Sequence, residues 1–539
     1  MKRLLSDFFT DEIAGAAGLL ERRNMADPLI SGIEYDSRKI KPGNIYCALR
    51  GLHMDGHLYI DDALAAGARA VVLEDEIPQK PDDAVFLRVT DSRHALSPLS
   101  AAFYGFPSRR LTVIGVTGTE GKSTTVYLIW QLLRLMGQPA GFFSTVQYSS
   151  GGDAQWNPEH QTTPEANVVQ RMLWEMAENG ARYAVVEASS HGLSPRTNRL
   201  GDVDFDVGVC TNVTHEHLEF HGTWEQYRHD KANLFRALDR RYTAEIAPDR
   251  EKNSHPFGVI NADDPSAAYF ADATRQRTVT FSVQGLPADL SLRSIEPGSG
   301  GNRYEVYDAA ANETLSIEDR LPGAFNAGNV LAALLTVGGV LDVAVSAVAP
   351  KVPELKPVRG RMTRIERGQP FEVLVDYAHT PSSFRTIFPP LRARLDKTGG
   401  RVITLFGSAG ERDTAKRSEQ GKIAADYSDT VILTDEDPRG ENPMDILEEI
   451  AQGCYASASC LASAGRTAGE KKPAFTRNDN LLLIPDRCAA IRKALSLAQG
   501  GDLVLLLGKG HENSIIYAHG PIPFDEIGEA EKALAEIGY

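Results

Sequence analysis

Short apolar runs alternate along the chain with longer stretches in which apolar and polar residues are mixed. The runs lie at residues 44–50, 67–74, 84–89, 111–116, 182–190, 205–213, 371–379, 401–410, 429–440 and 502–512. Runs of this kind are typical of buried strands, and strands that alternate with helices form parallel sheets. Such sheets bind ligands at the carboxyl ends of their strands. The Gly, Asp, His and Glu residues that end many runs are therefore the candidate site.

The runs fall into three regions. Residues 104–110 (YGFPSRR) contain Gly, Pro and Ser and are typical of a linker, and a third group of strands begins after residues 354–366. A chain of 539 residues is also too long for a single hydrophobic core. We therefore expect an α/β protein with three domains, at residues 1–107, 108–355 and 356–539.

The sequence GVTGTEGKSTT (115–125) follows one of the predicted strands. Gly118 and Gly121 allow a tight turn, Lys122 would lie along the β- and γ-phosphates, and the Ser123 hydroxyl would hold Mg²⁺. The motif is shorter than G-x-x-x-x-G-K-[ST] and is weak by itself. The amphipathic pattern of residues 124–136, however, predicts a helix directly after the loop. ATP or GTP is the expected ligand.

Two further strand ends carry residues suited to a metal or a phosphate. Glu187 could be the acidic partner of a Mg²⁺ held by Ser123, although a solvated glutamate at a strand end fits the sequence equally well. The stretch TNVTHEHLEFHG (211–222) concentrates histidines and glutamates, which favours metal or phosphate binding. Lys231, in the helical pattern that follows, is by itself typical of a solvated helix lysine.

Composition narrows the classes of function. The chain is 42% hydrophobic and 24% charged, as in globular proteins, and its formal net charge of −15 argues against nucleic acid or an anionic membrane as a partner. No apolar run approaches a membrane span, the N-terminus is a poor signal peptide, and the five cysteines lack metal-binding spacing. We expect a cytoplasmic enzyme with no membrane insertion.

A phosphate-binding domain beside a domain with polar strand ends suits a ligase. In such an enzyme ATP converts a carboxylate into an acyl phosphate, and an amine then attacks it. A nucleotide-dependent switch is the alternative from another class, but the base-reading N-K-x-D element is not found in the sequence. A catalytically inactive binding protein is a further alternative, because Glu120 adds a negative charge to the P-loop.

Motifs along nearly the whole chain resemble those of the Mur ligase family, and most closely the members that add a diamino acid to UDP-MurNAc-L-Ala-D-Glu. In chain order they are YDSRKIKPGNIYCALRG (35–51), DGHLYIDDALAAGA (55–68), GTEGKSTT (118–125), QTTPE (161–165), EASSHGL (187–193), TNVTHEHLEFHG (211–222), HDKANLF (229–235), LPGAFNAGNVLAA (321–333), VRGRM (358–362), VDYAHTP (375–381), GSAGERDTAKR (407–417), TDEDPRGENP (434–443) and GKGHE (508–512). A folylpolyglutamate-type ligase on the same scaffold is the alternative, but the first two motifs and TDEDPR count against it.

The resemblance implies a small N-terminal α/β domain that binds the uridine nucleotide, a central P-loop domain with a doubly wound, mostly parallel sheet, and a C-terminal Rossmann-like α/β domain. It also implies a monomer whose partners are ATP, Mg²⁺, the UDP-MurNAc-dipeptide and a free diamino acid. The implied ATP-binding residues are Gly118, Thr119, Glu120, Gly121, Lys122, Ser123, Thr124, Asn326, Asn329, Arg361, Asp376 and His379. The implied catalytic residues are Lys122, Lys231, Glu187 and His217.

The same resemblance assigns the metal and the two other substrates. The implied metal ligands are Ser123, Glu187, His217 and, in carbamylated form, Lys231. The residues implied for the UDP substrate are Ser37, Arg38, Thr162, Thr163, Ser189 and Arg199. The residues implied for the amino acid are Arg412, Glu436, Asp437, Arg439, Gly508 and Glu512.

Some positions depart from the family pattern. Glu120 stands where the family usually has Asn, and HEHLE replaces its RDHLD. Two extra residues between SSHGL (189–193) and FDV (205–207) leave Arg196 and Arg199 as alternatives for one substrate-binding arginine, and we prefer Arg199. In the amino-acid motif Asp437 favours a bare ammonium, as in lysine or ornithine, whereas Arg439 favours the distal carboxylate of meso-diaminopimelate. The sequence leaves the choice of diamino acid open.

Overall fold

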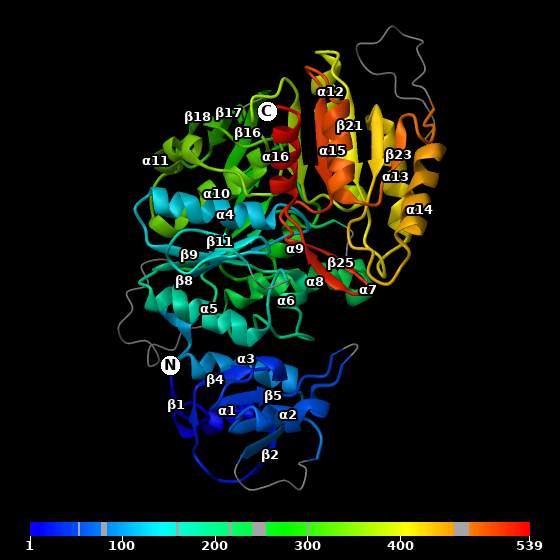
Figure 1. Ribbon diagram of the computed structural model, residues 1–539. Helices are drawn as coiled ribbons and strands as arrows, with labels where there is room; N and C mark the ends of the chain where they lie inside the picture. Colours follow the sequence, from blue (N-terminus) through cyan, green and yellow to red (C-terminus); the bar gives the residue numbers. More distant parts are fainter. Residues whose placement is uncertain are drawn as a thin grey trace. The chain divides into compact units, whose positions relative to one another are not determined.

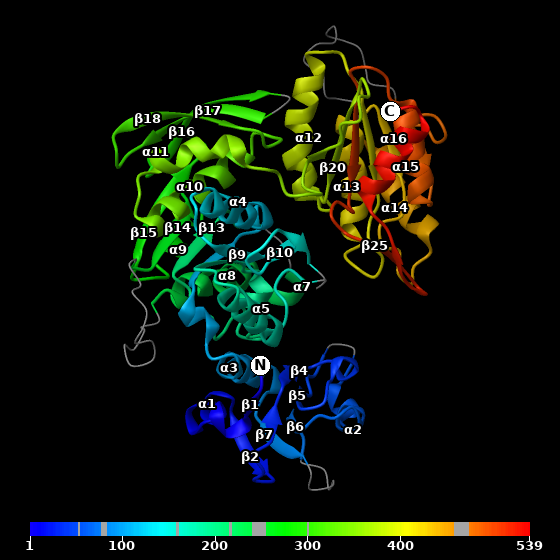
Figure 2. The ribbon, with the colours of Figure 1, turned by 60° about the vertical axis from the view of Figure 1, so that its left-hand side comes forward.

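The computed structural model describes residues 1–51, 54–76, 84–157, 161–214, 218–239, 255–298, 301–457 and 474–539. The chain divides into two compact units (Figures 1 and 2). The first comprises Met1–Ile295, Arg303–Glu318 and Phe325–Leu355, and the second comprises Glu296–Asn302, Asp319–Ala324 and Lys356–Tyr539.

The N-terminal part of the first unit is a five-stranded sheet with helices on both faces (Figure 1). Its strands, in sheet order, are β2 (Leu19–Arg23), β7 (Val85–Val89), β6 (Ala70–Leu73), β5 (Asn44–Cys47) and β4 (Gly32–Glu34), with β1 (Arg3–Leu4) and β3 (Leu29–Ile30) paired separately. Its helices are α1 (Asp11–Ala16), α2 (Ile60–Ala65) and α3 (Ser92–Phe103), with 3₁₀ turns η1 (Leu5–Asp7), η2 (Ser37–Lys39), η3 (Gly56–Tyr59) and η4 (Pro107–Arg110). Only β2 pairs antiparallel with its neighbour in the sheet.

The larger part of the first unit is built on an eleven-stranded sheet. Its strands, in sheet order, are β11 (Gln155–Trp156), β10 (Gln147–Ser149), β9 (Ala140–Phe143), β12 (Tyr183–Glu187), β8 (Thr112–Thr117), β13 (Val207–Cys210), β14 (Phe257–Asn261), β15 (Arg277–Ser282), β16 (Leu290–Gly298), β17 (Gly301–Asp308) and β18 (Glu313–Asp319). From β9 to β16 neighbouring strands pair parallel. The carboxyl ends of β8, β12 and β13 therefore meet at one edge.

Helices cover both faces of this sheet (Figures 1 and 2). They are α4 (Lys122–Leu135), α5 (Ala166–Glu178), α6 (Ser190–Leu193), α7 (Leu218–His221), α8 (Trp224–Ala237), α9 (Ala267–Ala271), α10 (Asn326–Leu341) and α11 (Val345–Val348), followed by the 3₁₀ turn η5 (Ala349–Glu354). Helices α4 and α10 pack together on one face, whereas α5 and α8 bury Leu173 and Leu234 in the core of the other.

The second unit is a six-stranded sheet with α12, α13 and α14 on one face and α15 and α16 on the other. Its strands, in sheet order, are β19 (Thr363–Arg364), β20 (Glu372–Asp376), β24 (Leu503–Leu507), β21 (Val402–Phe406), β22 (Thr430–Leu433) and β23 (Leu481–Leu483), with a separate hairpin of β25 (Ser514–Tyr517) and β26 (Gly520–Pro523). Its helices are α12 (Pro381–Asp396), α13 (Ala415–Tyr427), α14 (Pro443–Ala456), α15 (Arg487–Leu497) and α16 (Glu526–Glu536). Successive residues of β24 enter opposite cores, as in any strand buried on both faces.

These elements confirm the expected α/β class, the mostly parallel central sheet and the second α/β sheet. The helix expected at residues 124–136 is α4, which begins two residues earlier at Lys122. Residues 104–110 are better packed than a linker: Pro107 and Ser108 are buried, and Arg109 and Arg110 form ion pairs. The exact boundaries of the three domains stay predictions. Among the described residues no single helix is long and apolar enough to cross a membrane, although the pair α10 and Val345–Glu354, bent by 106°, meets that test together.

Candidate active site

The loop between β8 and α4 has the backbone that its glycines predict. Gly118 and Gly121 adopt φ angles of 149° and 82°, which favour glycine. A Cβ added at Gly118 would lie 1.9 Å from Thr211 Oγ1, and one at Gly121 would lie 2.6 Å from Asn329 Oδ1. Both positions therefore require glycine, because either side chain would collide with a neighbouring element. The loop leads into the N-terminus of α4, where backbone N–H groups and the helix dipole favour an anion.

Two residues of the loop motif meet partners at this edge of the sheet. Ser123 Oγ donates a 2.9 Å hydrogen bond to Glu187 Oε2, at the end of β12. Thr145 donates to both oxygens of the same carboxylate, from its N at 2.8 Å and its Oγ1 at 3.1 Å. Lys122 Nζ donates to Thr119 O at 2.8 Å. Ser123 and Glu187 therefore lie within hydrogen-bond distance, and Glu187 is a buried carboxylate rather than a solvated one; their shared Mg²⁺ stays a prediction.

The backbone of the loop is held by β13 and α8. Glu120 N donates to Asn212 Oδ1 at 2.9 Å, and Thr119 Oγ1 lies 3.1 Å from the Tyr227 hydroxyl. Lys231 is buried in α8 and its Nζ donates to Gly118 O at 2.5 Å. The solvated helix lysine that the local pattern suggested is thus a buried residue whose ammonium contacts the P-loop.

The donors at this edge fit Mg²⁺. The ion is held in many phosphate sites by one or two protein oxygens together with phosphates and water, and Ser123 and Glu187 supply such a pair. Among the described residues no three His, Cys, Asp or Glu side chains are grouped as metal ligands. His217, the other expected ligand and catalytic residue, lies outside the described residues. The protein oxygens at this site therefore suit an ion that also binds phosphate.

The residues expected to bind the muramoyl peptide gather beside Glu187. Thr163 Oγ1 donates to Glu187 O at 2.9 Å and accepts from Ser189 N at 3.0 Å. Arg199 Nη1 donates to Thr163 O at 2.8 Å, and its Nη2 donates to Glu165 Oε1 at 2.9 Å. Thr162 precedes this buried group and is half-buried.

Glu165 receives a second guanidinium, from Arg93 of α3, at 2.7 Å. Arg196 instead lies over the Phe220 ring and donates to Phe220 O at 2.7 Å. Of the two alternatives, Arg199 is thus the arginine beside Thr163. Two guanidinium groups around one buried carboxylate leave a net positive charge, which suits an anionic substrate.

The remaining residues predicted in the first unit lie in two groups. Ser37 and Arg38 belong to η2 in the N-terminal sheet, where Asp36 caps the turn and pairs with Arg38 at 2.8 Å. Asn326 and Asn329 lie in α10: Asn329 Nδ2 donates to Asn326 Oδ1 at 2.9 Å, and Asn329 Oδ1 accepts from Thr125 Oγ1 at 3.1 Å. Asn329 therefore contacts the P-loop helix and Asn326 contacts Asn329, while Thr124 is half-buried in the first turn of that helix.

In the second unit, three predicted nucleotide residues meet at the end of β20. Asp376 accepts hydrogen bonds from Met362 N and Ala378 N, each at 2.7 Å, and burial raises the pKa of its carboxyl. The Arg361 guanidinium lies 4.7 Å from the centre of the Tyr377 ring. His379 Nδ1 lies 2.9 Å from Tyr377 O. Arg361 and His379 therefore both contact the Tyr377 ring, and Asp376 directly precedes Tyr377 in the chain.

A cluster of acidic side chains occupies the ends of β22 and β24. Lys509 is fully buried, and its Nζ donates to Asp437 Oδ1 at 2.9 Å and also to Glu512. Burial raises the pKa of Glu436, whose Oε2 has no hydrogen-bond partner among the described residues. Burial also raises the pKa of Asp435 to about 6, although hydrogen bonding to Tyr517 opposes this. The cluster is acidic, with one buried cation at its centre.

An arginine from outside the cluster joins these strand ends. Arg487 pairs with Glu526 at 2.7 Å, and both side chains are fully buried. The Arg487 guanidinium also donates to Leu507 O at 2.7 Å and Asp435 O at 3.0 Å. It therefore ties β24 to the segment that carries the acidic residues.

The other predicted amino-acid residues differ in their surroundings. Gly508 adopts φ 102°, and a Cβ there would lie 2.8 Å from Glu436 Oε2. Arg439 has a left-handed backbone, with φ 55°, and its buried Nε has no hydrogen-bond partner in the described parts of the chain. Arg412 is exposed, whereas Arg417 is buried and bonded to Glu441 and Glu449, each at 2.9 Å.

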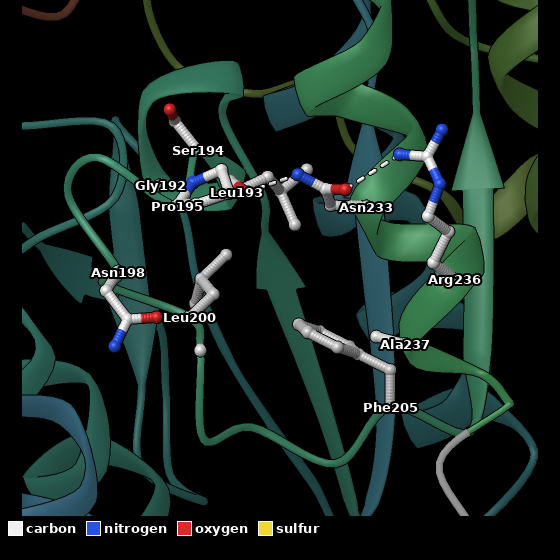
Figure 3. Close-up of a pocket in the computed structure, with 11 residues that line it drawn as sticks. Gly192, Leu193, Ser194, Pro195, Asn198, Leu200, Phe205, Asn233, Arg236 and Ala237 are labelled. Carbon is white, nitrogen blue, oxygen red and sulfur yellow. Dashed lines mark hydrogen bonds between the residues drawn. The ribbon is translucent and has the colours of Figure 1, made fainter. Parts of the chain in front are cut away.

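A cavity of about 260 Å³ is lined by residues of α6, of α8 and of the segment between α6 and β13, among them Leu200 and Phe205 (Figure 3). Asn233 Nδ2 donates to Leu193 O at 3.0 Å and Arg236 Nη1 donates to Asn233 Oδ1 at 2.7 Å. The residues that line the cavity do not include those of the P-loop, so the cavity is separate from the phosphate site.

Sequence reasoning missed several residues that the tertiary structure brings to these sites. Lys509 stands inside GKGHE, three residues before Glu512. Its position just after an apolar strand was the feature of the sequence that could have marked it as a site residue. Glu165 is the last residue of QTTPE, but the nearby sequence does not indicate its ion pair with Arg93, which lies 72 residues away in the chain. The expectation that the histidine-rich stretch binds metal or phosphate stays a prediction, because residues 215–217 lie outside the described residues; His221 of the same stretch is bonded to Asp230 and Ser190.

Comparisons with known proteins agree with this arrangement. Residues 29–104, 116–337 and 360–510 match, respectively, the models of the Mur ligase family catalytic domain, the Mur ligase middle domain and the Mur ligase glutamate ligase domain. A UDP-N-acetylmuramyl-tripeptide synthetase of Treponema denticola is 50% identical over 525 residues, which cover 94% of each chain. A UDP-N-acetylmuramoyl-L-alanyl-D-glutamate–2,6-diaminopimelate ligase of Geobacillus kaustophilus is 35% identical over 515 residues, covering 95% of this chain and 96% of the relative.

A solved structure of a UDP-N-acetylmuramoyl-L-alanyl-D-glutamate–2,6-diaminopimelate ligase shares the fold, with a TM-score of 0.58, 28% identity and coverage of 95% of this chain and 96% of that chain. The resemblance of the sequence motifs is thereby confirmed, and the folylpolyglutamate-type alternative is not favoured. This chain belongs to the Mur ligase family.

Proposed function

We propose that the protein is an ATP-dependent ligase that joins a diamino acid to the D-Glu residue of UDP-MurNAc-L-Ala-D-Glu. The observation that carries the proposal is that one residue, Glu187, is hydrogen-bonded both to the phosphate-binding loop and to the residues assigned to the acceptor peptide. Glu187 accepts from Ser123 of the P-loop, and its backbone carbonyl accepts from Thr163, which also bonds to Ser189. The phosphate site and the residues assigned to the acceptor peptide therefore share one strand end.

The reaction follows from this neighbourhood. The D-Glu carboxylate attacks the γ-phosphorus of ATP, which releases ADP and leaves an acyl phosphate. The amine of the diamino acid attacks the acyl carbon, inorganic phosphate leaves, and the nitrogen loses a proton to complete the amide. The P-loop N–H groups and Lys122 bind the nucleotide phosphates, and Arg199 orients the peptide. Mg²⁺, held by Ser123 and Glu187, would neutralise phosphate charge when bound.

We assign the diamino acid to the acidic cluster of the second unit. Asp435, Glu436, Asp437 and Glu512 supply four carboxylates, whereas the nearby cations are Lys509, Arg439 and Lys416, besides Arg487, whose charge is paired with Glu526. Excess negative charge attracts the second ammonium of the substrate. This charge count favours lysine or ornithine over meso-diaminopimelate, whose distal carboxylate would depend on Arg439. We further propose that the enzyme acts as a cytoplasmic monomer.

The test is ADP release, measured with and without each substrate. We expect release to require UDP-MurNAc-L-Ala-D-Glu and a diamino acid, and mass spectrometry to find the tripeptide product. Lysine, ornithine and meso-diaminopimelate are supplied separately to rank them. Lys122→Ala, which removes a charge beside the transferred phosphoryl group, should lower kcat by about a hundredfold or more. ADP release that is indifferent to the UDP substrate would refute the proposal.

A second test concerns Lys231. If it acts as a carbamate that binds the metal, Lys231→Ala should be inactive and partly rescued by acetate or formate, since these supply the missing carboxylate. Activity retained by Lys231→Ala would contradict this role.

A further inference from the structure

His221 lies at the centre of a buried network that the proposed reaction does not use. Its side chain is 0% exposed, its Nδ1 lies 2.8 Å from Asp230 Oδ2, and its Nε2 lies 3.1 Å from Ser190 Oγ. Gln226 Nε2 donates to the other Asp230 oxygen at 2.9 Å. The three elements α6, α7 and α8 are therefore joined through one imidazole.

The hydrogen-bond pattern defines the roles of the three groups. A carboxylate can only accept, so Nδ1 carries the proton that is donated to Asp230; in the neutral imidazole Nε2 then accepts the Ser190 hydroxyl proton. The order Ser–His–Asp is that of a hydrolase triad. Counted as whole residues, with the backbone included, Ser190 and His221 are only 2% and 6% exposed, so no substrate reaches the hydroxyl. The network therefore serves to fix positions rather than to supply a nucleophile.

The residues beside the network are those assigned to the reaction. Asp230 directly precedes Lys231, whose Nζ contacts Gly118 O of the P-loop at 2.5 Å. Ser190 directly follows Ser189 of the peptide site. Fixing the Asp230 carboxylate fixes the rotation of α8 about its axis, and hence the direction of the Lys231 side chain, because consecutive residues keep a constant angle around a helix.

We infer that His221 is a positioning residue. By hydrogen bonding to Asp230 and Ser190, it fixes α8 relative to α6, and thereby holds Lys231 of α8 in contact with the P-loop. This inference rests on the proposed function for its kinetic consequence, but its structural consequence can be measured separately. Outer partners that orient such groups typically change activity by about 10- to 100-fold when removed.

The variants separate the two hydrogen bonds from ring packing. His221→Phe keeps a ring beside Phe220 and Tyr227 but removes both bonds. His221→Asn places an amide N–H near the Nδ1 position and keeps the donation to Asp230. His229→Phe is the matched control, since His229 is an exposed histidine of α8 whose Nδ1 lies 3.1 Å from the Tyr269 hydroxyl and 3.2 Å from Arg236 Nη2, outside the Asp230 network.

Hydrogen exchange provides the readout that is independent of catalysis. In His221→Phe we expect faster exchange in peptides covering residues 115–121 and 224–237, intermediate exchange in His221→Asn, and no change in the control. Equal exchange of the P-loop peptide in all variants would overturn the inference, even if the wild-type protein proved not to ligate these substrates.

Kinetics provide the second readout. We expect kcat of His221→Phe to fall about 10- to 100-fold, with partial recovery in His221→Asn and KM for the UDP substrate within about twofold of wild type. If His221→Phe fails to fold, His221→Asn is the variant that tests the inference. A lowered kcat in His221→Asn with P-loop hydrogen exchange equal to that of the wild type would overturn the positioning role. An inactive wild type would refute the proposed function and leave the exchange experiment decisive.

Discussion

Replacing Lys509 by Met should destabilise the second unit strongly. The Lys509 ammonium is fully buried between Asp437 and Glu512, and the raised pKa of nearby Glu436 shows how poorly this site solvates charge. Met has a similar volume, so the substitution removes the charge without opening a large cavity. Removing one partner of a buried ion pair typically costs about 3–5 kcal/mol, because the remaining charge is left uncompensated. We expect a loss of this size in the free energy of unfolding.

The measurement needs a probe inside the second unit. All four tryptophans, Trp130, Trp156, Trp174 and Trp224, lie in the first unit, so their fluorescence does not report on it. Hydrogen exchange of the β24 peptide at residues 503–507, followed over a range of denaturant concentrations, reports its opening directly. Lys532→Met is the control, since Lys532 is an exposed lysine paired with Glu529 at 2.7 Å and should show no measurable loss. A Lys509→Met protein as stable as Lys532→Met would refute the ion-pair reasoning.

Three further substitutions test the other parts of the site. Gly118→Ala should abolish ATP-dependent thermal stabilisation, since the new Cβ would lie 1.9 Å from Thr211 Oγ1, and a normal ATP-induced shift in Tm would contradict it. Burial raises the pKa of Asp435 from 3.8 to about 6, so ionisation of this carboxyl lowers the free energy of unfolding as the pH rises through that range. Asp435→Asn should therefore increase the free energy of unfolding by up to about 3 kcal/mol at pH 8 and by little near pH 4, measured by denaturant unfolding. Arg199→Lys should raise KM for the UDP substrate at least about tenfold, because the fork to Glu165 and Thr163 is lost, whereas Arg196→Lys should stay near wild type; the reverse order would exchange their roles.

Local chemistry determined much of the site from sequence alone. The Gly118 and Gly121 positions, the strand before them and the helix after them follow from turn geometry and hydrophobic periodicity, which act over a few residues. The polar ends of β12, β20 and β22 were also recognisable from local sequence, because polar residues begin where the carboxyl end of a buried strand leaves the core. The motif resemblance then implied roles that the hydrophobic pattern cannot predict, such as that of Lys231 as a carbamylated metal ligand.

Partnerships between distant residues were decided only by the tertiary structure. Ser123 meets Glu187 across 64 residues because the sheet places β8 directly beside β12, and Lys509 meets Asp437 across 72 residues at the ends of β24 and β22. Periodicity identifies a strand but not its neighbours, since any buried strand offers the same backbone hydrogen bonds. Which charges face one another is therefore set by the tertiary arrangement. The local pattern alone suggested a solvated lysine at Lys231, whereas the fold buries this residue and places its ammonium against Gly118 O.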